Sequence, residues 1–530
     1  MTTYRSSESS VVNGKKPTKP SINLDRWLIP IAILICVLLG VSLYFLPQIT
    51  ALLLALIGIG IPAFLLIWSR PEFGLIGILF FTSSFISPED ILDLRLPIGG
   101  GLDFQDVFFL LVVGMLVFRV LIKKKPITLL GGVGIGLAIF LAMAVFSIVF
   151  ALVFQNTESN WALNDFRNLL HYCLFFITLW NIEEKKQIDI IHYGMYLIAD
   201  ISVVIIILQQ FAGANNPLLL AMSRSRDWRI YERASGARVI PASHLIMHYW
   251  WIISFAMLAF TPRKSRWRIF YIFQIIFIGV GHMLTYVRSQ WVASVIGLGL
   301  MAYILIPKFR DQMPKIIILA VALAMVFTTV IGVVGLDAIS KFPLFEGIVD
   351  RAVSLFNPVQ VAESNSLQWR AFENREAINA ILKDPLTGVG LGGRYRDLTT
   401  LAGEAMGWMT RDDISAGVVS RFTRYVHNSY LHIAVKMGIP ALAVLLTSFI
   451  LFIGKGWKAY QNMDDSMYKG MVLGILLSFI GILAWAYFHT HLLKLESIPI
   501  IAITIGLVGG IMKNHTSWIS QPPPENTQTP

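Results

Sequence analysis

Long apolar segments recur along almost the whole chain, and no other feature constrains its fold as strongly. Many of them run for about 18 to 20 residues, the length at which an α-helix crosses the hydrocarbon core of a bilayer. Charged residues make up only 14% of the 530 residues, whereas a soluble domain carries about 25%. The sequence therefore predicts an all-α polytopic membrane protein.

Hydropathy divides the apolar sequence into about fourteen spans. They are expected near residues 27–46, 51–68, 73–87, 107–122, 129–154, 169–181, 190–211, 242–260, 269–286, 291–306, 316–335, 439–454, 470–488 and 498–512. The third and the sixth are short, so each could be tilted or half-spanning. The first is too long for the hydrophobic region of a signal peptide, and no A-x-A site follows it, so an uncleaved helix is expected.

Basic residues gather in short loops on one side of these spans. The loops contain KKK at 123–125, KK at 185–186, PRKSRWR at 262–268, PKFR at 307–310, and Lys455 with Lys458. The basic N-terminal tail falls on the same side, which the positive-inside rule identifies as cytoplasmic. The tails at 1–26 and 513–530 are therefore expected to be cytoplasmic, and their polar composition predicts disorder.

A long polar segment separates two groups of spans. It covers residues 336–438, between the helices expected within residues 27–335 and those within residues 439–512. Connections of this length are usually functional or disordered. Because the run SLQWRAFENREAINAIL inside it has the pattern of an amphipathic helix, we predict a large, partly helical extracytoplasmic loop.

Four glycines follow this helical run in the sequence TGVGLGGRY, at positions 388, 390, 392 and 393. GxGxG alone is a weak signal for a nucleotide site. Neither a strand–turn–helix context nor a following Lys-Ser/Thr accompanies it here. The glycines are better explained by backbone that comes close to a ligand or to a partner segment.

The loop ends in a polar stretch that runs directly into an apolar one, RFTRYVHNSYLHIAVKMGIPAL, residues 421–442. Asn428 or Ser429 is a suitable N-cap for the helical run that follows. Gly438 would end that run and Pro440 would open the next span. The pattern predicts two consecutive helices with a break between them.

His427 would then lie just before a helix N-terminus. The positive end of the helix dipole disfavours an imidazolium there and attracts phosphate. A neutral histidine in that place could accept a proton beside an anion. A lone histidine more often only hydrogen-bonds a loop to a helix. Arg421 and Arg424 would by default be solvated or would lie at the lipid headgroups.

Two arginines interrupt apolar sequence at the outer membrane face. Arg288 lies in LTYVRSQWVASVIGLGL, and Arg167 precedes a span in WALNDFRNLLHYCLFF. A guanidinium at the hydrocarbon edge is costly unless it snorkels to the headgroups or pairs with an anion. Snorkelling would explain each arginine alone. The alternative is that both bind one diphosphate, which arginine contacts bidentately.

Other ionisable and reactive residues point to no further chemistry. Cys36 and Cys173 both lie in apolar runs, as small buried hydrophobic residues do. Asp200 and His282 lie within spans, where either a functional role or a structural partner is expected. The net charge of +11 is spread over many loops, so nucleic acid is not an expected partner. Outward loops contain no DxD or ExD pair, and we expect a reaction without a metal or a cofactor.

Several segments, in this order, resemble the O-antigen ligase/polymerase superfamily of bacterial membrane glycosyltransferases. They are LDFQDVFFLL at 102–111, DFRNLL, RASGARVIPASHLIMHY at 233–249, LTYVRSQWVAS, QWRAFENREAINAILKDPLTGVGLG and HNSYLHIAVKMGIPAL. The last two are the most specific, and the similarity covers residues 70–450. Val287 departs from the pattern, because the family often has serine there.

The resemblance implies a GT-C-like bundle of about 12–14 transmembrane helices. It also implies a multi-pass glycosyltransferase in the bacterial inner membrane, with its active site facing the periplasm or the outside. Such an enzyme takes a glycan from undecaprenyl diphosphate and joins it, with inversion and without metal, to an acceptor hydroxyl. The acceptor would be lipid A–core or a growing polysaccharide, with membrane lipids as further partners.

Residue roles follow from the same resemblance, position by position. His427 would be the base or would orient the acceptor, and Arg288 would stabilise the leaving diphosphate together with Arg167. Arg370 is a weaker candidate for the same anion. Arg424 and Asn428 are further candidates for substrate binding, although Asn428 is also a candidate N-cap.

Three alternatives remain open from the sequence. Ligation to lipid A–core and polymerisation of repeat units are not distinguished by these motifs. A lipid-linked oligosaccharide flippase or another transporter would also have many spans, but such proteins keep short loops and bind near the midplane. A structural subunit that only binds a lipid-linked glycan is the third.

Overall fold

A computed structural model of the chain describes residues 48–85, 104–212, 229–231, 238–309, 365–396, 423–464 and 467–519. The chain divides into two units, residues 1–69 and residues 70–530. The described part of the first unit is one apolar helix, α2 (Gln48–Ser69), with Pro62 inside it. The expected spans at residues 27–46 and 316–335, the tail at 1–26 and residues 520–530 lie outside the described residues. Residues 513–519, expected to be the disordered start of the C-terminal tail, instead continue the last helix, α23 (Ile498–Ile519).

The described part of the second unit is almost entirely helical. Its helices are α3 (Pro71–Thr82), α5 (Phe104–Ile122), α6 (Gly132–Val153), α7 (Ser159–Leu170), the 3₁₀ turn η1 (His171–Cys173), α8 (Leu174–Asn181), α9 (Lys185–Ala212), α11 (His244–Phe260), α12 (Trp267–Leu284), α13 (Arg288–Phe309), α18 (Asn365–Lys383), α21 (Ser429–Asn462), α22 (Met467–Trp485) and α23 (Ile498–Ile519). One antiparallel hairpin joins β1 (Arg229–Tyr231) to β2 (Arg238–Ile240), with Ile230 opposite Val239.

Among the described residues, seven helices are long and apolar enough to cross a membrane. They are the helices at Gln105–Ile122, Gly132–Val153, Lys185–Gln209, Trp267–Leu284, Arg288–Pro307, Ser429–Asn462 and Met467–Trp485. Four shorter apolar helices accompany them, at Gly60–Ser69, Pro71–Thr82, His244–Phe260 and Ile498–Asn514. The predicted all-α polytopic membrane architecture is confirmed. The GT-C-like topology and the count of 12–14 helices stay predictions.

The two spans that the sequence marked as short are indeed short helices. α3 has 12 residues, and the segment expected at 169–181 is divided into η1 and an α8 of 8 residues. An α-helix of 12 residues is about 18 Å long, which is less than the ~30 Å of a hydrocarbon core. These elements therefore do not span a bilayer by themselves.

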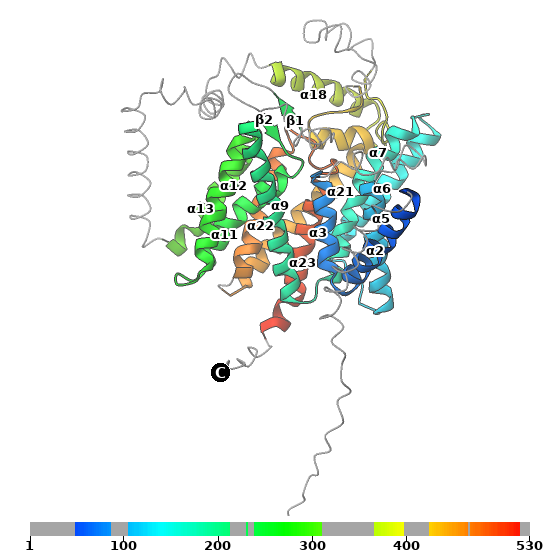
Figure 1. Cartoon of the computed structure of the whole chain (residues 1–530). Coiled ribbons are helices and arrows are strands. Elements are labelled where there is room, and N and C mark those ends of the chain that lie inside the picture. The colour runs from blue at the N-terminus through cyan, green and yellow to red at the C-terminus, as the bar shows by residue number, and fades with distance from the viewer. Residues whose placement is uncertain are drawn as a thin grey trace, which may run out of the picture. The chain divides into compact units, whose positions relative to one another are not determined.

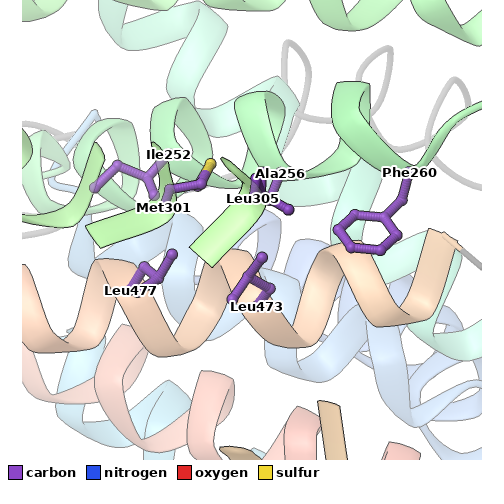
Figure 2. Packing of buried hydrophobic residues seen from close by; sticks show 7 residues of the cluster. All are labelled: Ile252, Ala256, Phe260, Met301, Leu305, Leu473 and Leu477. Carbon is purple, nitrogen blue, oxygen red and sulfur yellow. The ribbon is translucent and has the colours of Figure 1, made fainter. Parts of the chain in front are cut away.

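One packing core is formed where α11, α13 and α22 meet. Figure 2 shows its seven buried side chains, which are Ile252, Ala256 and Phe260 of α11, Met301 and Leu305 of α13, and Leu473 and Leu477 of α22. Lipid tails are as apolar as these side chains, so the association depends on close van der Waals packing rather than on a hydrophobic driving force between the helices.

α18 lies at the end of the helix bundle that is predicted to face outward. Figure 1 shows α18 lying across this end, beside the start of α21. Seven buried residues join the segment of α18 to that of α21; they are Ala377, Ala380, Ile381, Tyr395, Val426, Ala434 and Val435. The helical run predicted within residues 336–438 is therefore present, and it packs on α21. Residues 336–364 and 397–422 of this loop lie outside the described residues.

α21 consists of two helical parts with a break at Gly438. The backbone there is non-helical (φ 81°, ψ 167°), and Pro440 follows directly. The Ile439 N–H, which the break leaves without a helical partner, donates to the Pro385 carbonyl at 2.8 Å. The predicted end of the first helix at Gly438 is thus confirmed. A short helical segment, 429–437, precedes the apolar part of α21.

Candidate functional site

The short first part of α21 is capped by Asn428. Its side-chain oxygen accepts hydrogen bonds from the backbone N–H groups of Tyr430 at 3.0 Å and Leu431 at 3.3 Å. Asn428 rather than Ser429 is therefore the N-cap, and its side chain is buried. This local geometry places His427 immediately before a helix N-terminus, as the sequence predicted. A direct role of Asn428 in substrate binding stays a prediction.

The imidazole of His427 contacts a carboxylate from a distant part of the chain. His427 Nδ1 lies 2.7 Å from Glu373 Oε2, and the His427 backbone N–H donates to the same oxygen at 3.3 Å. Glu373 belongs to α18, and its side chain is 1% exposed, whereas that of His427 is 40% exposed. The ring is therefore held on one edge by a buried carboxylate and reaches the surface with the other.

Glu373 is itself held by two more side chains. Its Oε1 accepts a hydrogen bond from Trp369 Nε1 at 2.9 Å and lies 3.8 Å from Arg396 Nη2. The Arg396 guanidinium is buried and lies 5.1–5.3 Å from the ring centroids of Trp369, Phe372 and Tyr395. A cation at aromatic faces is stabilised by the ring quadrupoles. The carboxylate and its cationic partner therefore form one buried polar unit in contact with His427.

Arg370 lies one helical turn before Glu373 on α18. Burial lowers the pKa of Arg370, the carboxylate of Glu373 raises it, and the positive charge of Arg288 lowers it further. The last effect requires Arg288, the first residue of α13, to lie near Arg370. Two of the arginines that the sequence selected are thus electrostatic neighbours.

The connection from α22 to α23, residues 486–497, links this region to Arg288. Ser429 donates its backbone N–H to the Ala486 carbonyl at 2.9 Å and its hydroxyl to the His489 carbonyl at 2.5 Å. Trp485, directly before this connection, donates its indole N–H to Ser289 Oγ at 2.8 Å. The start of α21 and the start of α13 are therefore fastened to the same short segment, which brings the neighbourhoods of His427 and Arg288 together.

Several positive groups gather around His489 in this connection. Burial lowers the pKa of His489 well below its ordinary value, and the charges of Arg370, Lys494, His427 and His244 act in the same direction. Lys494 is partly compensated by Glu496, at 3.0 Å from Nζ to Oε1. The surroundings of His489 therefore contain an excess of positive groups, as an anion-binding region requires.

Arg424 is engaged in contacts with other parts of the chain. Its Nε donates to the Gly392 carbonyl at 2.9 Å, its Nη2 lies 2.8 Å from Glu158 Oε1, and its guanidinium lies 4.6 Å from the Trp161 ring centroid. The side chain is buried. These contacts tie the glycine segment to α7. The predicted substrate-binding role of Arg424 stays a prediction, while Arg421 lies outside the described residues.

The glycine segment lies against other parts of the backbone. Gly388, Gly390 and Gly392 have φ of 62°, 81° and 72°, and a Cβ at Gly392 would stand 2.3 Å from the Ala162 nitrogen. Asp165 accepts a hydrogen bond from the Gly392 N–H at 2.9 Å, and burial raises the pKa of that carboxyl. The expectation of close backbone approach is confirmed for this segment, and the partners seen are α6, α7 and α21.

Arg167 pairs with a carboxylate from another helix. Its Nη1 lies 2.5 Å from Asp106 Oδ2 of α5, and its Nη2 donates to Asn164 Oδ1 at 3.2 Å. The expected convergence of Arg167 and Arg288 on one diphosphate stays a prediction.

The two ionisable groups noted within spans have structural partners. Asp200 accepts a hydrogen bond from Gln274 at 2.9 Å, and His282 contacts Gln290 and Ser294.

Two residues of this site were missed in the sequence. Glu373 follows Arg370 by three positions in a predicted helix, and this spacing places both on one face. The spacing could have identified Glu373 as a neighbour of the candidate Arg370. His489 lies in the short sequence His-Thr-His, residues 489–491, between two apolar segments. No local pattern identifies it as a site residue. Within the described residues, no group of three or more His, Cys, Asp or Glu side chains is arranged to hold a metal ion.

The comparison with known families adds one match. The sequence pattern of the family described as O-antigen ligase matches residues 273–446. This range contains Arg288, Arg370, Glu373 and His427, and it runs from α12 into the apolar part of α21. No curated protein matches the chain.

Proposed function

We propose, from the match of residues 273–446 to the O-antigen ligase family, that the chain is a membrane glycosyltransferase of the O-antigen ligase/polymerase superfamily. It would move a glycan from undecaprenyl diphosphate to an acceptor hydroxyl. The acceptor is lipid A–core or a growing polysaccharide chain. The reaction takes place at the outer face of the bacterial inner membrane, with inversion and without a metal. It needs a base for the acceptor and a cationic site for the leaving group.

The contact between His427 and Glu373 carries this proposal. An ionised carboxylate only accepts hydrogen bonds, so Nδ1 of His427 donates across the 2.7 Å contact. In the neutral ring, the lone pair is then on Nε2. The ring is 40% exposed, so Nε2 is the atom available to a substrate. This arrangement supports His427 as the general base.

The proposed transfer is a single displacement. The acceptor oxygen attacks the anomeric carbon while its proton passes to Nε2 of His427. The new glycosidic C–O bond forms as the bond from the anomeric carbon to the diphosphate oxygen breaks. The electron pair of that bond leaves with the diphosphate, and the proton on His427 later passes to solvent or to the released diphosphate.

Arg288 and Arg370 are the proposed partners of the leaving diphosphate. Negative charge grows on its bridging oxygen during the transfer, and fixed cations stabilise such charge without reorganisation. The positive charge of Arg288 lowers the pKa of Arg370, and two arginines that lie near each other suit a ligand with two negative phosphate groups. Arg167, Arg424 and Asn428 remain secondary candidates for substrate contacts.

A transporter of lipid-linked oligosaccharides is the second candidate function. Such carriers bind their cargo near the middle of the membrane, often at broken helices. Here His427 precedes the first residue of α21 and Arg288 is the first residue of α13, so the chemically suited groups lie at helix ends. This favours a transferase.

The test is the surface polysaccharide profile of a deletion strain that carries either the wild-type gene or His427→Ala. Arg375→Ala, in an exposed position of α18, is the matched control and is expected to give the wild-type profile. Membrane abundance of each variant is measured by immunoblot.

Each outcome assigns or removes a role. If the strain with His427→Ala carries only single repeat units on the normal anchor, the protein is a polymerase. Long chains that remain on undecaprenyl diphosphate beside a bare core identify a ligase. A normal ladder from well-expressed His427→Ala would remove His427 from catalysis. Lipid-linked glycan that accumulates only on the cytoplasmic face would instead identify a transporter.

A further inference from the structure

We propose that Glu373 is a positioning residue that acts through His427, and that Arg396 holds the Glu373 carboxylate in place. The inference rests on the proposed role of His427 as the base and adds the group that orients it. The geometry that points to it consists of two successive contacts: a buried cation lies near a buried carboxylate, and the carboxylate contacts a partly exposed imidazole.

Glu373 is not suited to act on the acceptor directly. Its side chain is 1% exposed. Its Oε2 accepts from the ring and from the backbone of His427, and its Oε1 accepts from Trp369. A carboxylate with both oxygens engaged and no route to the surface has no contact to offer a substrate. Its effect must therefore pass through the residues that it binds.

The two hydrogen bonds from His427 to one oxygen restrict the ring. The backbone N–H and Nδ1 of the same residue converge on Glu373 Oε2 at 3.3 Å and 2.7 Å. Because the backbone N–H and Nδ1 bind the same oxygen, the side-chain torsions of His427 are restricted and Nε2 points away from Glu373. This is the geometry of a base whose orientation and tautomer are set by a neighbouring carboxylate.

Arg396 explains how a charged Glu373 is tolerated in a buried place. A carboxylate that loses its water needs a cation or several donors. Arg396 supplies the cation at 3.8 Å, and three aromatic rings surround the guanidinium. The side chain of Arg396 is itself buried, which restricts the position of its guanidinium. The carboxylate therefore has Arg396 near one oxygen and His427 at the other.

The substitution Glu373→Gln tests whether Glu373 orients the His427 ring or only fills space beside it. Glutamine has the same shape, but its NH₂ group can donate to Nδ1 and so leave the proton on Nε2, where it blocks base catalysis. We expect the maximal rate to fall about 10- to 10³-fold, with little change in the extract concentration that gives half of the maximal rate. Glu376→Gln is the matched control, since Glu376 lies one turn further along α18 and pairs with Arg375 at 3.8 Å.

The experiment is a double-mutant cycle on the purified full-length protein. Wild type, Glu373→Gln, His427→Ala and the double variant are each added to a lipid extract of the deletion strain, which contains the native donor and acceptor. Serial dilution of the extract gives the maximal rate and the half-saturation point. If Glu373 acts only through His427, the double variant is no slower than His427→Ala alone.

The outcomes separate this inference from the proposed function. Glu373→Gln at the wild-type rate, or a double variant slowed by the product of both single effects, overturns the role of Glu373. His427→Ala at the wild-type rate overturns the proposed base itself. Should Glu373→Gln fail to fold, Glu373→Asp enters the same cycle, because it keeps the charge but shortens its reach; an unchanged rate would equally refute the inference.

Discussion

Trp485 donates its indole N–H to Ser289 Oγ at 2.8 Å, and this bond fastens the end of α22 to the residue beside Arg288. The next residue, Ala486, accepts a hydrogen bond from the backbone of Ser429. Two helix N-termini from distant parts of the chain are thereby fixed to one short segment. The relative position of His427 and Arg288 therefore depends on residues 485–489 as much as on the two helices themselves.

Arg288→Ala is expected to lower kcat/KM for glycan transfer by about 10²- to 10³-fold, since a fixed donor to the developing charge is lost. Arg288→Lys should recover part of the rate, because lysine keeps the charge but not the bidentate fork. The rates are measured with purified protein and the lipid extract of a deletion strain. Arg266→Ala, at an exposed position between α11 and α12, is the control. An unchanged rate for Arg288→Ala would exclude this arginine from the leaving-group site.

Gly438→Ala is expected to destabilise the protein. A Cβ at this position would lie 2.1 Å from the Leu386 carbonyl oxygen, and the backbone has φ 81°. This combination of positive φ with extended ψ is essentially restricted to glycine and costs about 1–3 kcal/mol for a residue with a side chain. The contact with the backbone cannot be relieved by a rotamer change. The melting temperature of the detergent-solubilised protein should fall clearly.

The control for Gly438→Ala is Gly454→Ala in the same helix, where a Cβ would meet nothing within 4 Å. That variant should melt at the wild-type temperature or slightly above it, because alanine favours a helix interior over glycine. Equal melting temperatures for both variants would show that the break at Gly438 has no role in stability.

Acid is expected to destabilise the connection between α22 and α23 through His489 and His491. Burial lowers the pKa of both rings well below 6.5, the ordinary value, and neighbouring positive groups lower it further. Between the folded and unfolded pKa values, the unfolded chain binds more protons, so stability is present above pH 6.5 and is lost as the pH falls below it. Each ring contributes at most about 1.4 kcal/mol per pH unit.

The measurement is the melting temperature between pH 7.5 and pH 5 for wild type and for the double variant His489→Gln, His491→Gln. The melting temperature of the variant should rise relative to that of the wild type as the pH falls. Parallel curves would show that these rings do not govern acid sensitivity. Glutamine keeps a polar side chain of similar length at either position. A loss of stability of equal size at all pH values would come from the substitution itself and not from protonation of the histidines.

Local features of the site were readable from the sequence. The cap at Asn428, the helix end at Gly438 and the amphipathic helix before the glycines each depend on residues within a few positions of one another. The placement of His427 before a helix N-terminus follows from them. The apolar segments likewise identified a polytopic helical protein, because their length relative to the bilayer is a property of the chain itself.

The partners of these residues were decided by the tertiary structure. Glu373 and His427 are separated by 54 positions, and the pattern of α18 shows only which residues share a face, not what that face meets. Arg424 likewise looked like a free cation in the sequence, yet in the fold it lies buried against Gly392 and Glu158. Local patterns were therefore enough to predict most helices, the cap and break of α21, and a set of candidate groups. Which groups meet depends on long-range packing among the helices and on the connection between α22 and α23, and no local pattern encodes those contacts.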